Sequence, residues 1–317
     1  MKIKDILSIL SYLEANIKSE SIDIKGVAFD SRLVGPGYVF FALCGSNTDG
    51  HLYLEEARRN GAVLIVGERK DPLCALSHSV SWILVESGRK ALALVSNLFY
   101  GHPSLNLRVM GVTGTNGKTT TCFLVRSIWE KSGLPCGLLT TVRNLIGPWE
   151  IESINTTEES LRIFQYLHMM RRMGMKDVVM EVSSHGLAIG RVEGVQFDAA
   201  MVTNLVPEHL EFHQTFEHYF ASKRKLFEKV AENFAKNYPR IAIANGDDEH
   251  CLRMIRELGI PYLTYGFGRN VDVWADDVHF SLKGSQFWVF TPWGSMDVEM
   301  AFPGRHNVYN ALGALTL

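Results

Sequence analysis

Residues 107–125 read Leu-Arg-Val-Met-Gly-Val-Thr-Gly-Thr-Asn-Gly-Lys-Thr-Thr-Thr-Cys-Phe-Leu-Val, and this stretch decides the fold. The apolar run that ends at Thr113 predicts a strand, Gly114 and Gly117 predict a tight turn, and the pattern that follows predicts a helix. In that order, the three elements place backbone N–H groups and the positive end of a helix around an anionic phosphate. The stretch therefore predicts a phosphate-binding loop in an α/β fold.

Each residue of this loop has an expected role in binding ATP. Lys118 is expected to reach the terminal phosphates, and the hydroxyl of Thr119 is expected to bind Mg²⁺. The first glycine of the common pattern would fall at Val112, so Gly114 supplies the flexibility instead. The alternative, a glycine-rich turn with a chance lysine, is disfavoured by the flanking strand and helix. The expected nucleotide-binding residues are Gly114, Thr115, Asn116, Gly117, Lys118, Thr119 and Thr120.

The composition excludes several classes of protein. The 317 residues are 46% hydrophobic and 21% charged, which is typical of a globular chain. A formal charge of −2 gives no overall electrostatic reason for nucleic-acid binding. No apolar stretch approaches the ~20 residues of a membrane-spanning helix. We therefore expect neither a nucleic-acid partner nor a membrane partner.

The cysteines and the N-terminus indicate where the protein works. Residues 1–17 predict an amphipathic helix rather than a signal peptide. The cysteines form no Cys-x-x-Cys pair, which argues against a zinc site and against a disulfide framework. That usage suits a reducing cytoplasm, where we expect the protein to be located. The five cysteines are Cys44, Cys74, Cys122, Cys136 and Cys251.

The length allows two domains. We expect a boundary where a helix ending near Leu98 meets Gly101 and Pro103, which gives domains 1–101 and 102–317. The first is expected to be a small α/β domain. Its predicted elements are strands at 26–29, 38–42, 63–66 and 82–85 and a helix at 53–60.

The second predicted domain alternates strands and helices, which implies a mostly parallel sheet covered on both faces. From 271 to 301 the period changes to two, which predicts an antiparallel strand group with turns at 283–284 and 293–294. A helical pattern then begins after Pro303-Gly304 and stops without a C-cap, so we expect a further C-terminal domain that this chain lacks. The predicted strands are 107–113, 136–139, 177–182, 199–203, 241–245 and 261–265. The first predicted helix follows the phosphate loop and ends near residue 132, and the others cover 158–173, 216–234 and 248–258.

Polar residues follow two of the predicted strands. Glu181 ends the apolar run 177–182 and is expected to hold a metal on the nucleotide phosphates, because strand ends line the ligand crevice of a parallel sheet. The alternative is that Glu181 caps a helix or pairs with an arginine. His209, after the next strand, is a candidate cation ligand, and His213 shares its face if the segment is helical.

Lys223 is one of three neighbouring basic residues, with Arg224 and Lys225, and nothing in the local pattern distinguishes it. Taken together, however, the motifs resemble those of the Mur ligase family, and within it the MurE type, over essentially the whole chain. The matching segments are Asp30-Ser31-Arg32, Pro36-Gly37, Asp49-Gly50-His51, Gly61-Ala62, the phosphate loop, Asn155-Thr156-Thr157, residues 181–187, Arg191, Thr203-Asn204-Leu205, His209-Leu210 and residues 304–310.

The resemblance implies a domain that holds the UDP part of the substrate, with Ser31 near the uridine, and a central ATPase domain. It implies an ATP-dependent ligase of peptidoglycan synthesis that acts as a monomer. This ligase would add meso-diaminopimelate or L-lysine to UDP-N-acetylmuramoyl-L-alanyl-D-glutamate through an acyl phosphate. Since the Rossmann-like C-terminal domain that selects the amino acid is expected to be missing, we expect no ligation by residues 1–317 alone.

The same resemblance implies the roles of the site residues. Lys118, Lys223, Glu181 and His209 match catalytic positions. Two Mg²⁺ ions are implied, one held by Thr119 and Glu181 and one by His209, and Lys223 matches a lysine that carries a carbamate and binds metal. The implied contacts with the muramoyl and diphosphate portions are Thr156, Thr157, Ser183 and Arg191, and those on the adenine side are Asn307 and Asn310.

The chain departs from the family pattern at three places. Glu158-Glu159 stands where a proline is frequent, Glu208 where an aspartate is common, and His306 where a phenylalanine is frequent. Two alternative functions stay open. One is a folylpolyglutamate- or cyanophycin-type amide ligase, and the other is a nucleotide-binding chain without ligase activity.

Overall fold

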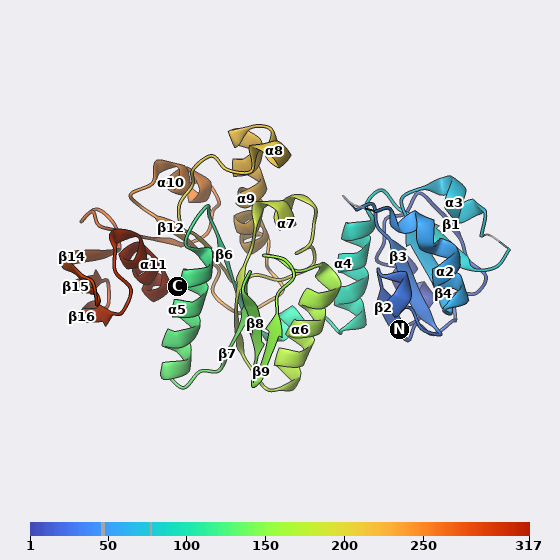
Figure 1. Cartoon of the computed structure of the whole chain (residues 1–317), viewed down its shortest axis with the longest axis horizontal. Helices are drawn as coiled ribbons and strands as arrows, with labels where there is room; N and C mark the ends of the chain where they lie inside the picture. The colour runs from blue at the N-terminus through green and yellow to red at the C-terminus, as the bar shows by residue number, and fades with distance from the viewer. Residues whose placement is uncertain (46–47, 77) are drawn as a thin grey trace. The chain divides into compact units, whose positions relative to one another are not determined.

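The computed structural model describes residues 1–45, 48–76 and 78–317, which form two compact units (Figure 1). Unit 1 contains Met1–Pro103 together with the short segments Glu159–His168 and Ile189–Val195. Unit 2 contains Ser104–Glu158, Met169–Ala188 and Gln196–Leu317. In the described residues, no helix combines the length and the apolar character that a membrane span requires.

Unit 1 is built on a five-stranded sheet in the order β1-β5-β4-β3-β2. Strands β2 to β5 are parallel, and β1 pairs antiparallel with β5. The four predicted strands are confirmed, with ends that move by one residue at most. The strands are β1 (Glu14–Asn16), β2 (Gly26–Ala28), β3 (Tyr38–Ala42), β4 (Ala62–Gly67) and β5 (Ser81–Leu84).

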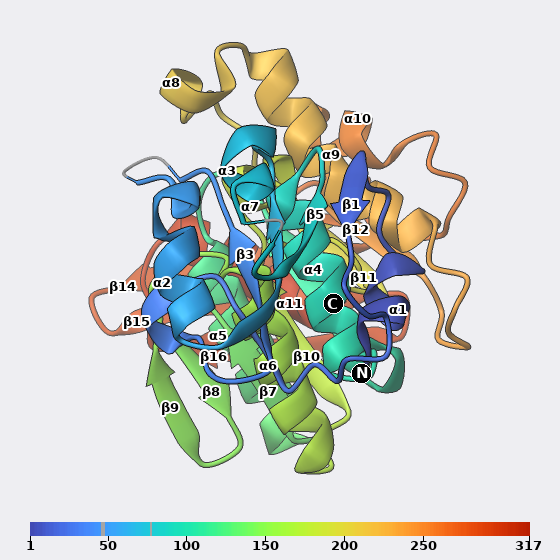
Figure 2. The same cartoon turned by 90° about the vertical axis from the view of Figure 1, so that its right-hand side faces the viewer.

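Helices cover both faces of this sheet, because alternate residues of each strand point to opposite sides. Val39 and Phe41 pack with α1 (Ile3–Leu7) and α4 (Gly88–Phe99). Phe40, from the other face of β3, packs with α2 (Leu54–Arg59) and α3 (Lys70–Cys74). Figure 2 shows the helices and strands of this unit. The short 3-10 helices η1 (Ser31–Leu33), η2 (Gly50–Tyr53) and η3 (Pro103–Asn106) complete the N-terminal region.

The predicted helix over residues 1–17 is wrong. Only Ile3–Leu7 is helical, and Glu14–Asn16 forms β1. The backbone N–H of Leu13 donates to the carbonyl of Leu84 at 2.8 Å, and β1 then pairs with β5. The strand edge of β5 thus supplies backbone partners that override the local helical pattern.

Unit 2 contains an 11-stranded sheet in the order β16-β15-β14-β13-β12-β11-β6-β10-β7-β8-β9. The strands from β7 to β14 in this order are parallel, and both ends of the sheet are antiparallel. The strands are β6 (Arg108–Thr113), β7 (Cys136–Leu139), β8 (Arg143–Ile146), β9 (Trp149–Glu152), β10 (Asp177–Glu181), β11 (Ala199–Val202), β12 (Ile241–Asn245), β13 (Tyr262–Gly266), β14 (Val273–Ser281), β15 (Gly284–Thr291) and β16 (Gly294–Met300).

This sheet confirms the predicted fold class, a small α/β unit followed by a mostly parallel sheet with an added antiparallel group. The turns predicted at 283–284 and 293–294 separate β14 from β15 and β15 from β16. The hairpin of β8 and β9 was not predicted. Its turn at Gly147-Pro148 carries the expected residues, but each strand has only four residues, and the apolar residues of β8 are adjacent rather than alternating.

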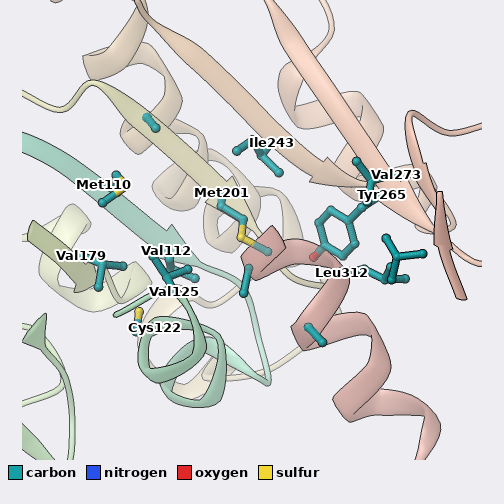
Figure 3. Packing of buried hydrophobic residues seen from close by; sticks show 14 of the residues in the cluster. Met110, Val112, Cys122, Val125, Val179, Met201, Ile243, Tyr265, Val273 and Leu312 are labelled. Atoms are coloured by element: carbon teal, nitrogen blue, oxygen red, sulfur yellow. The ribbon is translucent and has the colours of Figure 1, made fainter. Parts of the chain in front are cut away.

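Helices lie on both faces of the larger sheet. Helices α5 and α11 pack on one face, where Val125 and Leu312 join Met201 and Tyr265 in the main core (Figure 3). On the other face, Leu226 of α9 packs closely on Gly111. A Cβ added to Gly111 would lie 2.8 Å from Leu226 Cδ1. The helices are α5 (Lys118–Lys131), α6 (Ser160–Arg172), α7 (Ser184–Ala188), α8 (Leu210–His213), α9 (Phe216–Ala231), α10 (Glu249–Ile255) and α11 (Arg305–Thr316).

The strand order positions a crevice at the end of β6. Strand β6 lies between β10 and β11, with Val112 opposite Glu181 and Thr113 opposite Val202. Strands β10 and β7 lie on one side of β6, and β11 and β12 lie on the other. Ligands of open parallel sheets bind where the strand order reverses in this way. The segments that follow β6, β10 and β11 therefore share one edge.

Candidate active site

The turn after β6 has a backbone that only glycine accommodates at two positions. Gly114 has φ 133° and Gly117 has φ 84°. A Cβ on Gly114 would lie 2.0 Å from Thr203 Oγ1, and a Cβ on Gly117 would lie 2.2 Å from Asn310 Oδ1. The turn is therefore packed between the end of β11 and helix α11.

Side chains of this turn fasten it to its surroundings. Thr115 Oγ1 hydrogen-bonds to Tyr219 Oη at 2.9 Å, donates to the carbonyl of Val206 at 3.1 Å and accepts from its N–H at 3.0 Å. The N–H of Asn116 donates to Asn204 Oδ1 at 3.0 Å. These contacts fix the position of the loop. Thr119 and Thr120, in the first turn of α5, are half-buried.

Two lysines far apart in the sequence meet at one carbonyl. Lys118 Nζ donates to the carbonyls of Gly114 at 3.1 Å and Thr115 at 2.7 Å. Lys223 Nζ, from the buried face of α9, donates to the same carbonyl of Gly114 at 2.8 Å. Burial and then the charge of Lys118 hold the pKa of Lys223 well below its usual value, and burial also lowers the pKa of Lys118. The fold thus places beside the turn the lysine that the local pattern did not distinguish.

Glu181 is a buried carboxylate next to the same loop. Its side chain is 1% exposed. Its Oε1 accepts from the N–H of Thr141 at 3.2 Å and its Oε2 from the hydroxyl of Thr141 at 3.1 Å. Its charge opposes the lowering of the Lys118 pKa that burial causes. These hydrogen bonds come from a threonine rather than an arginine, and a carboxylate of this kind suits a hard cation such as Mg²⁺.

His209 differs from these three residues, because its side chain is 58% exposed. Its backbone is left-handed, with φ 56°, at the start of the four-residue helix α8. Its ring nitrogens lie 3.4 Å from Glu211 and 3.8 Å from Glu208. Within the part of the chain that the structure describes, no hydrogen bond or ion pair joins His209 to Lys118, Glu181 or Lys223.

His213, at the other end of α8, is buried, so the two histidines do not share an environment. Its Nδ1 lies 3.5 Å from Ser222 Oγ, and Ser222 Oγ donates to the carbonyl of His218. Burial, helped by His218 and Lys223, lowers the pKa of His213 to about 4, so this imidazole is neutral at pH 7.

A cavity of about 510 Å³ opens beside the turn in unit 2. Its lining includes Asn116, Gly117 and Asn310, so it reaches the predicted adenine-side residue Asn310. Asn307 is not among its lining residues, and its amide donates to the carbonyl of Pro303 at 2.8 Å. His306, one of the departures from the family pattern, also lines the cavity.

The sequence analysis missed three further lining residues, Asn245, Asp247 and Tyr309. Asp247 Oδ2 accepts from the N–H of Phe267 at 2.7 Å and from Tyr309 Oη at 2.8 Å. Asn245 ends β12 and Asp247 follows it, so the strand-end rule that led to Glu181 also applies to them.

Two of the predicted substrate residues lie together in unit 2. Thr157 Oγ1 accepts from the N–H of Ser183 at 2.9 Å and lies 3.1 Å from its hydroxyl. Thr156, the residue before Thr157, is half-buried. Glu158, which replaces a frequent proline, accepts from the N–H of Ile154 at 2.9 Å. An acidic side chain therefore holds this loop where a rigid ring would otherwise do so.

The other two predicted substrate residues, Ser31 and Arg191, belong to unit 1. Ser31 Oγ donates to Glu56 Oε2 at 2.6 Å, and both line a cavity of about 540 Å³. Arg191 Nε donates to Glu159 Oε1 at 2.8 Å, and Glu159 also lines that cavity together with Arg89. Arg89 is a residue that the sequence analysis missed, because its pairing with Glu159 at 3.6 Å joins segments 70 positions apart.

A second polar cluster in unit 1 resembles a metal site in composition only. Cys44, Asp49 and His51 lie close together. His51 Nε2 accepts from the N–H groups of Glu68 and Arg69 at 2.9 and 3.2 Å, so its proton is on Nδ1, which lies 2.7 Å from Asp49. Because both ring nitrogens are engaged, this histidine joins the segment before η2 to the segment after β4 rather than binding metal.

Comparisons with known proteins agree with this architecture. The sequence model described as the Mur ligase middle domain matches residues 112–317, and the one described as the Mur ligase family catalytic domain matches residues 23–100. The chain is 37% identical over 317 residues to the UDP-N-acetylmuramoyl-L-alanyl-D-glutamate–2,6-diaminopimelate ligase of Clostridium tetani. That match covers 99% of this chain and 63% of the relative, so the chain spans about 63% of the length of such relatives.

Solved structures show the same likeness. A structure described as a UDP-N-acetylmuramoyl-L-alanyl-D-glutamate–2,6-diaminopimelate ligase superposes with a TM-score of 0.82 at 27% identity, over 99% of this chain and 62% of that one. The MurF ligase from Thermotoga maritima in complex with ADP superposes with a TM-score of 0.62 at 21% identity, over 93% of this chain and 62% of that one. At that identity the second likeness concerns the fold alone.

Proposed function

The chain belongs to the Mur ligase family, and from that premise we propose that it carries the ATP-binding and UDP-substrate-binding parts of a MurE-type ligase. This ligase would join meso-diaminopimelate or L-lysine to UDP-N-acetylmuramoyl-L-alanyl-D-glutamate in the cytoplasm. Two observations carry the proposal: Lys118 and Lys223 donate to the same carbonyl of Gly114, and Glu181 pairs with Val112 near the end of β6.

The proposed reaction has two steps. An oxygen of the free side-chain carboxylate of D-glutamate attacks the γ-phosphorus of ATP, ADP leaves, and an acyl phosphate forms. The amine of the diamino acid then attacks the acyl carbon, loses a proton, and inorganic phosphate leaves. Negative charge concentrates on the phosphoryl oxygens in the first step, and preorganised donors aimed at them lower its barrier.

Lys118 and the backbone of the turn are proposed to supply these donors. The Lys118 ammonium now donates to two carbonyls of its own loop, 3.1 and 2.7 Å away. A phosphate would replace those carbonyls as the acceptor, and N–H groups at the start of α5 would add to the positive potential. The cavity beside Asn116 and Asn310 would take the nucleoside, and Asn307 is proposed as a further contact on the adenine side.

Thr119 and Glu181 are proposed to hold one Mg²⁺, and His209 to contribute to a second. The donor set fits this ion, because it offers a hydroxyl and a buried carboxylate beside a phosphate loop. Bound Mg²⁺ neutralises charge on the transferred phosphoryl group. His209 lies on an exposed segment in this structure, so its part in the site depends on how Val206–Gln214 is arranged when nucleotide is bound.

Lys223 is proposed to carry a carbamate. Its neutral nitrogen attacks the carbon of CO₂ and loses one proton, which leaves an N–C bond and an anionic oxygen pair. The burial of Lys223, at 2% exposure, supports the neutral amine that this step requires, whereas Lys225 is exposed. A carbamate signal in the ¹³C NMR spectrum of the protein under ¹³CO₂, absent from K223A and kept in K225A, is the expected result.

Each unit is proposed to contribute residues that bind the substrate. The cavity that contains Ser31 would take the UDP portion, and Arg191, Thr156, Thr157 and Ser183 would contact the muramoyl and diphosphate portions. We keep 1–101 and 102–317 as the proposed functional domains and a monomer as the proposed state.

Calorimetry with the purified chain tests the proposal. We expect MgATP and UDP-N-acetylmuramoyl-L-alanyl-D-glutamate each to bind, and no binding of the UDP substrate at high micromolar concentration would contradict it. Peptide-bond formation is assayed separately, and no product is expected from residues 1–317 alone. Turnover of a pterin substrate would favour the folylpolyglutamate-type alternative, and ATP binding without UDP-substrate binding would favour a nucleotide-binding chain.

A further inference from the structure

A single residue holds both oxygens of the Glu181 carboxylate. The N–H of Thr141 donates to Oε1 at 3.2 Å, and the hydroxyl of the same residue donates to Oε2 at 3.1 Å. Thr141 follows β7, a strand adjacent to β10 in the sheet. Thr141 belongs to none of the motifs that resemble the Mur ligase family.

The turn that carries Thr141 is itself held in place. Thr140 Oγ1 donates to the carbonyl of Arg143 at 2.7 Å, and the N–H of Thr140 donates to Asn144 Oδ1 at 3.3 Å. Asn144 is fully buried and pairs with Leu139 across the β7–β8 hairpin. The two donors of Thr141 therefore approach Glu181 from a fixed direction.

A carboxylate needs such a partner in order to bind a metal with a defined geometry. The terminal torsion of a glutamate side chain has no sharp preference of its own, so the plane of the carboxylate is free to turn unless neighbours hold it. Thr141 occupies one lone pair on each oxygen, and within the described residues no other side-chain or backbone donor bonds to either oxygen. Partners of this kind orient metal ligands and are worth about 10–100-fold in metal affinity.

We propose that Thr141 is a positioning residue that fixes the Glu181 carboxylate for the Mg²⁺ of the nucleotide. This inference rests on the proposed function, since it takes Glu181 as a metal ligand. Thr141 itself does not touch the nucleotide in this proposal, and it acts only through Glu181.

Two substitutions separate the hydroxyl donor from the shape of the side chain. T141V keeps the volume and the backbone N–H but removes the hydroxyl, and T141S keeps the hydroxyl but removes the methyl group. The readout is a Mg²⁺ titration of the binding of a fluorescent ATP analogue to the full 317-residue chain, with EDTA as the metal-free reference. We expect T141V to need about 10-fold more Mg²⁺ for half-maximal binding, and T141S to stay close to the unsubstituted chain.

The outcomes distinguish this inference from the proposed function. If the unsubstituted chain binds the analogue with no dependence on Mg²⁺, the metal site itself is refuted, and the role of Thr141 with it. If it depends on Mg²⁺ and T141V behaves identically, only the role of Thr141 is refuted. Equal weakening of T141V and T141S would also overturn the inference, because the hydroxyl would then not be responsible. Melting temperatures and binding in EDTA, both expected to be unchanged in T141V, show that the variant is folded.

Discussion

The two cavities have nearly the same volume, about 540 Å³ in unit 1 and about 510 Å³ in unit 2, but they are built differently. The cavity of unit 2 lies against a backbone turn whose shape depends on Gly114 and Gly117. The cavity of unit 1 is lined by side chains that pair with one another, such as Ser31 with Glu56 and Arg89 with Glu159.

This difference explains which cavity could be found from the sequence. A turn of glycines between a strand and a helix is a local pattern, so the phosphate loop was predicted residue by residue. Paired side chains from distant segments have no local pattern, so Arg89 and Glu159 were not predicted as cavity residues. Four pairs of variants test whether backbone and side chains have these separate roles.

The largest effect is expected from G114A. The added Cβ would lie 2.0 Å from Thr203 Oγ1 at a φ of 133°. Backbone strain of about 1–2 kcal/mol and overpacking of about 1–3 kcal/mol together lower the free energy of unfolding by about 2–5 kcal/mol. Denaturant unfolding measures this change, and ATP binding is expected to be lost.

The matched control is G133A. Gly133 also has a positive φ, 78°, but a Cβ there meets nothing within 4 Å. This variant is expected to show only the strain of about 1–2 kcal/mol and to keep ATP binding. Equal losses in the two variants would mean that the contact with Thr203 does not shape the turn.

The second effect concerns the ammonium group in the same turn. K118A removes a charged donor, whose hydrogen bonds are worth about 1.5–3 kcal/mol, so ATP should bind roughly 10–150-fold more weakly. Calorimetry measures the affinity. The exposed Lys225 provides the control, and K225A should bind ATP normally. A K118A variant with unchanged affinity would remove Lys118 from the phosphate site.

The third effect concerns the side chains that build the cavity of unit 1. E159Q keeps an acceptor for Arg191 but loses its charge, which should lower the free energy of unfolding by about 1–2 kcal/mol. Binding of the UDP substrate should weaken, whereas ATP binding should not change. The exposed carboxylate of Glu55, paired with Arg58 and Arg59, is the control, and E55Q should bind the UDP substrate normally. Loss of ATP binding in E159Q would contradict the proposal that the two cavities bind different ligands.

The smallest effect is expected from S31A. It removes the hydroxyl that donates to Glu56 at 2.6 Å. The neutral hydrogen bond that this hydroxyl is proposed to form with the uridine is worth about 0.5–1.5 kcal/mol, so affinity for UDP should fall roughly 2- to 13-fold. Fluorescence competition with UDP measures the change, and S21A, at an exposed serine of the same unit, should not alter it. Equal affinity in both variants would remove Ser31 from the uridine pocket.

Most elements of the fold were predicted because their patterns are local. The strands 38–42, 136–139 and 241–245 have the predicted ends, since a buried parallel strand is an apolar run bounded by turn residues. The N-terminal helix was overextended because the pairing of β1 with β5 has no signal within residues 1–17. The hairpin of β8 and β9 was missed because each strand has only four residues and the apolar residues of β8 do not alternate.

The candidate site divides in the same way. Glu181 was predicted because strand ends line the ligand crevice of a parallel sheet, and a carboxylate in an apolar strand also requires a partner. That the partner is Thr141, 40 positions earlier, depends on the adjacency of β7 and β10. His209 was chosen by the same rule, and its place at the metal site stays a prediction.

The amino-acid sequence by itself determined the alternation of strands and helices, the glycine turn after β6 and the lysine that begins α5. These features depend on backbone conformation and on periodicity within a few residues. Only the tertiary structure decided that Lys223 shares the carbonyl of Gly114 with Lys118, and that Thr141 holds Glu181. The physical reason is that such contacts depend on the order in which strands and helices pack, and no stretch of neighbouring residues encodes that order.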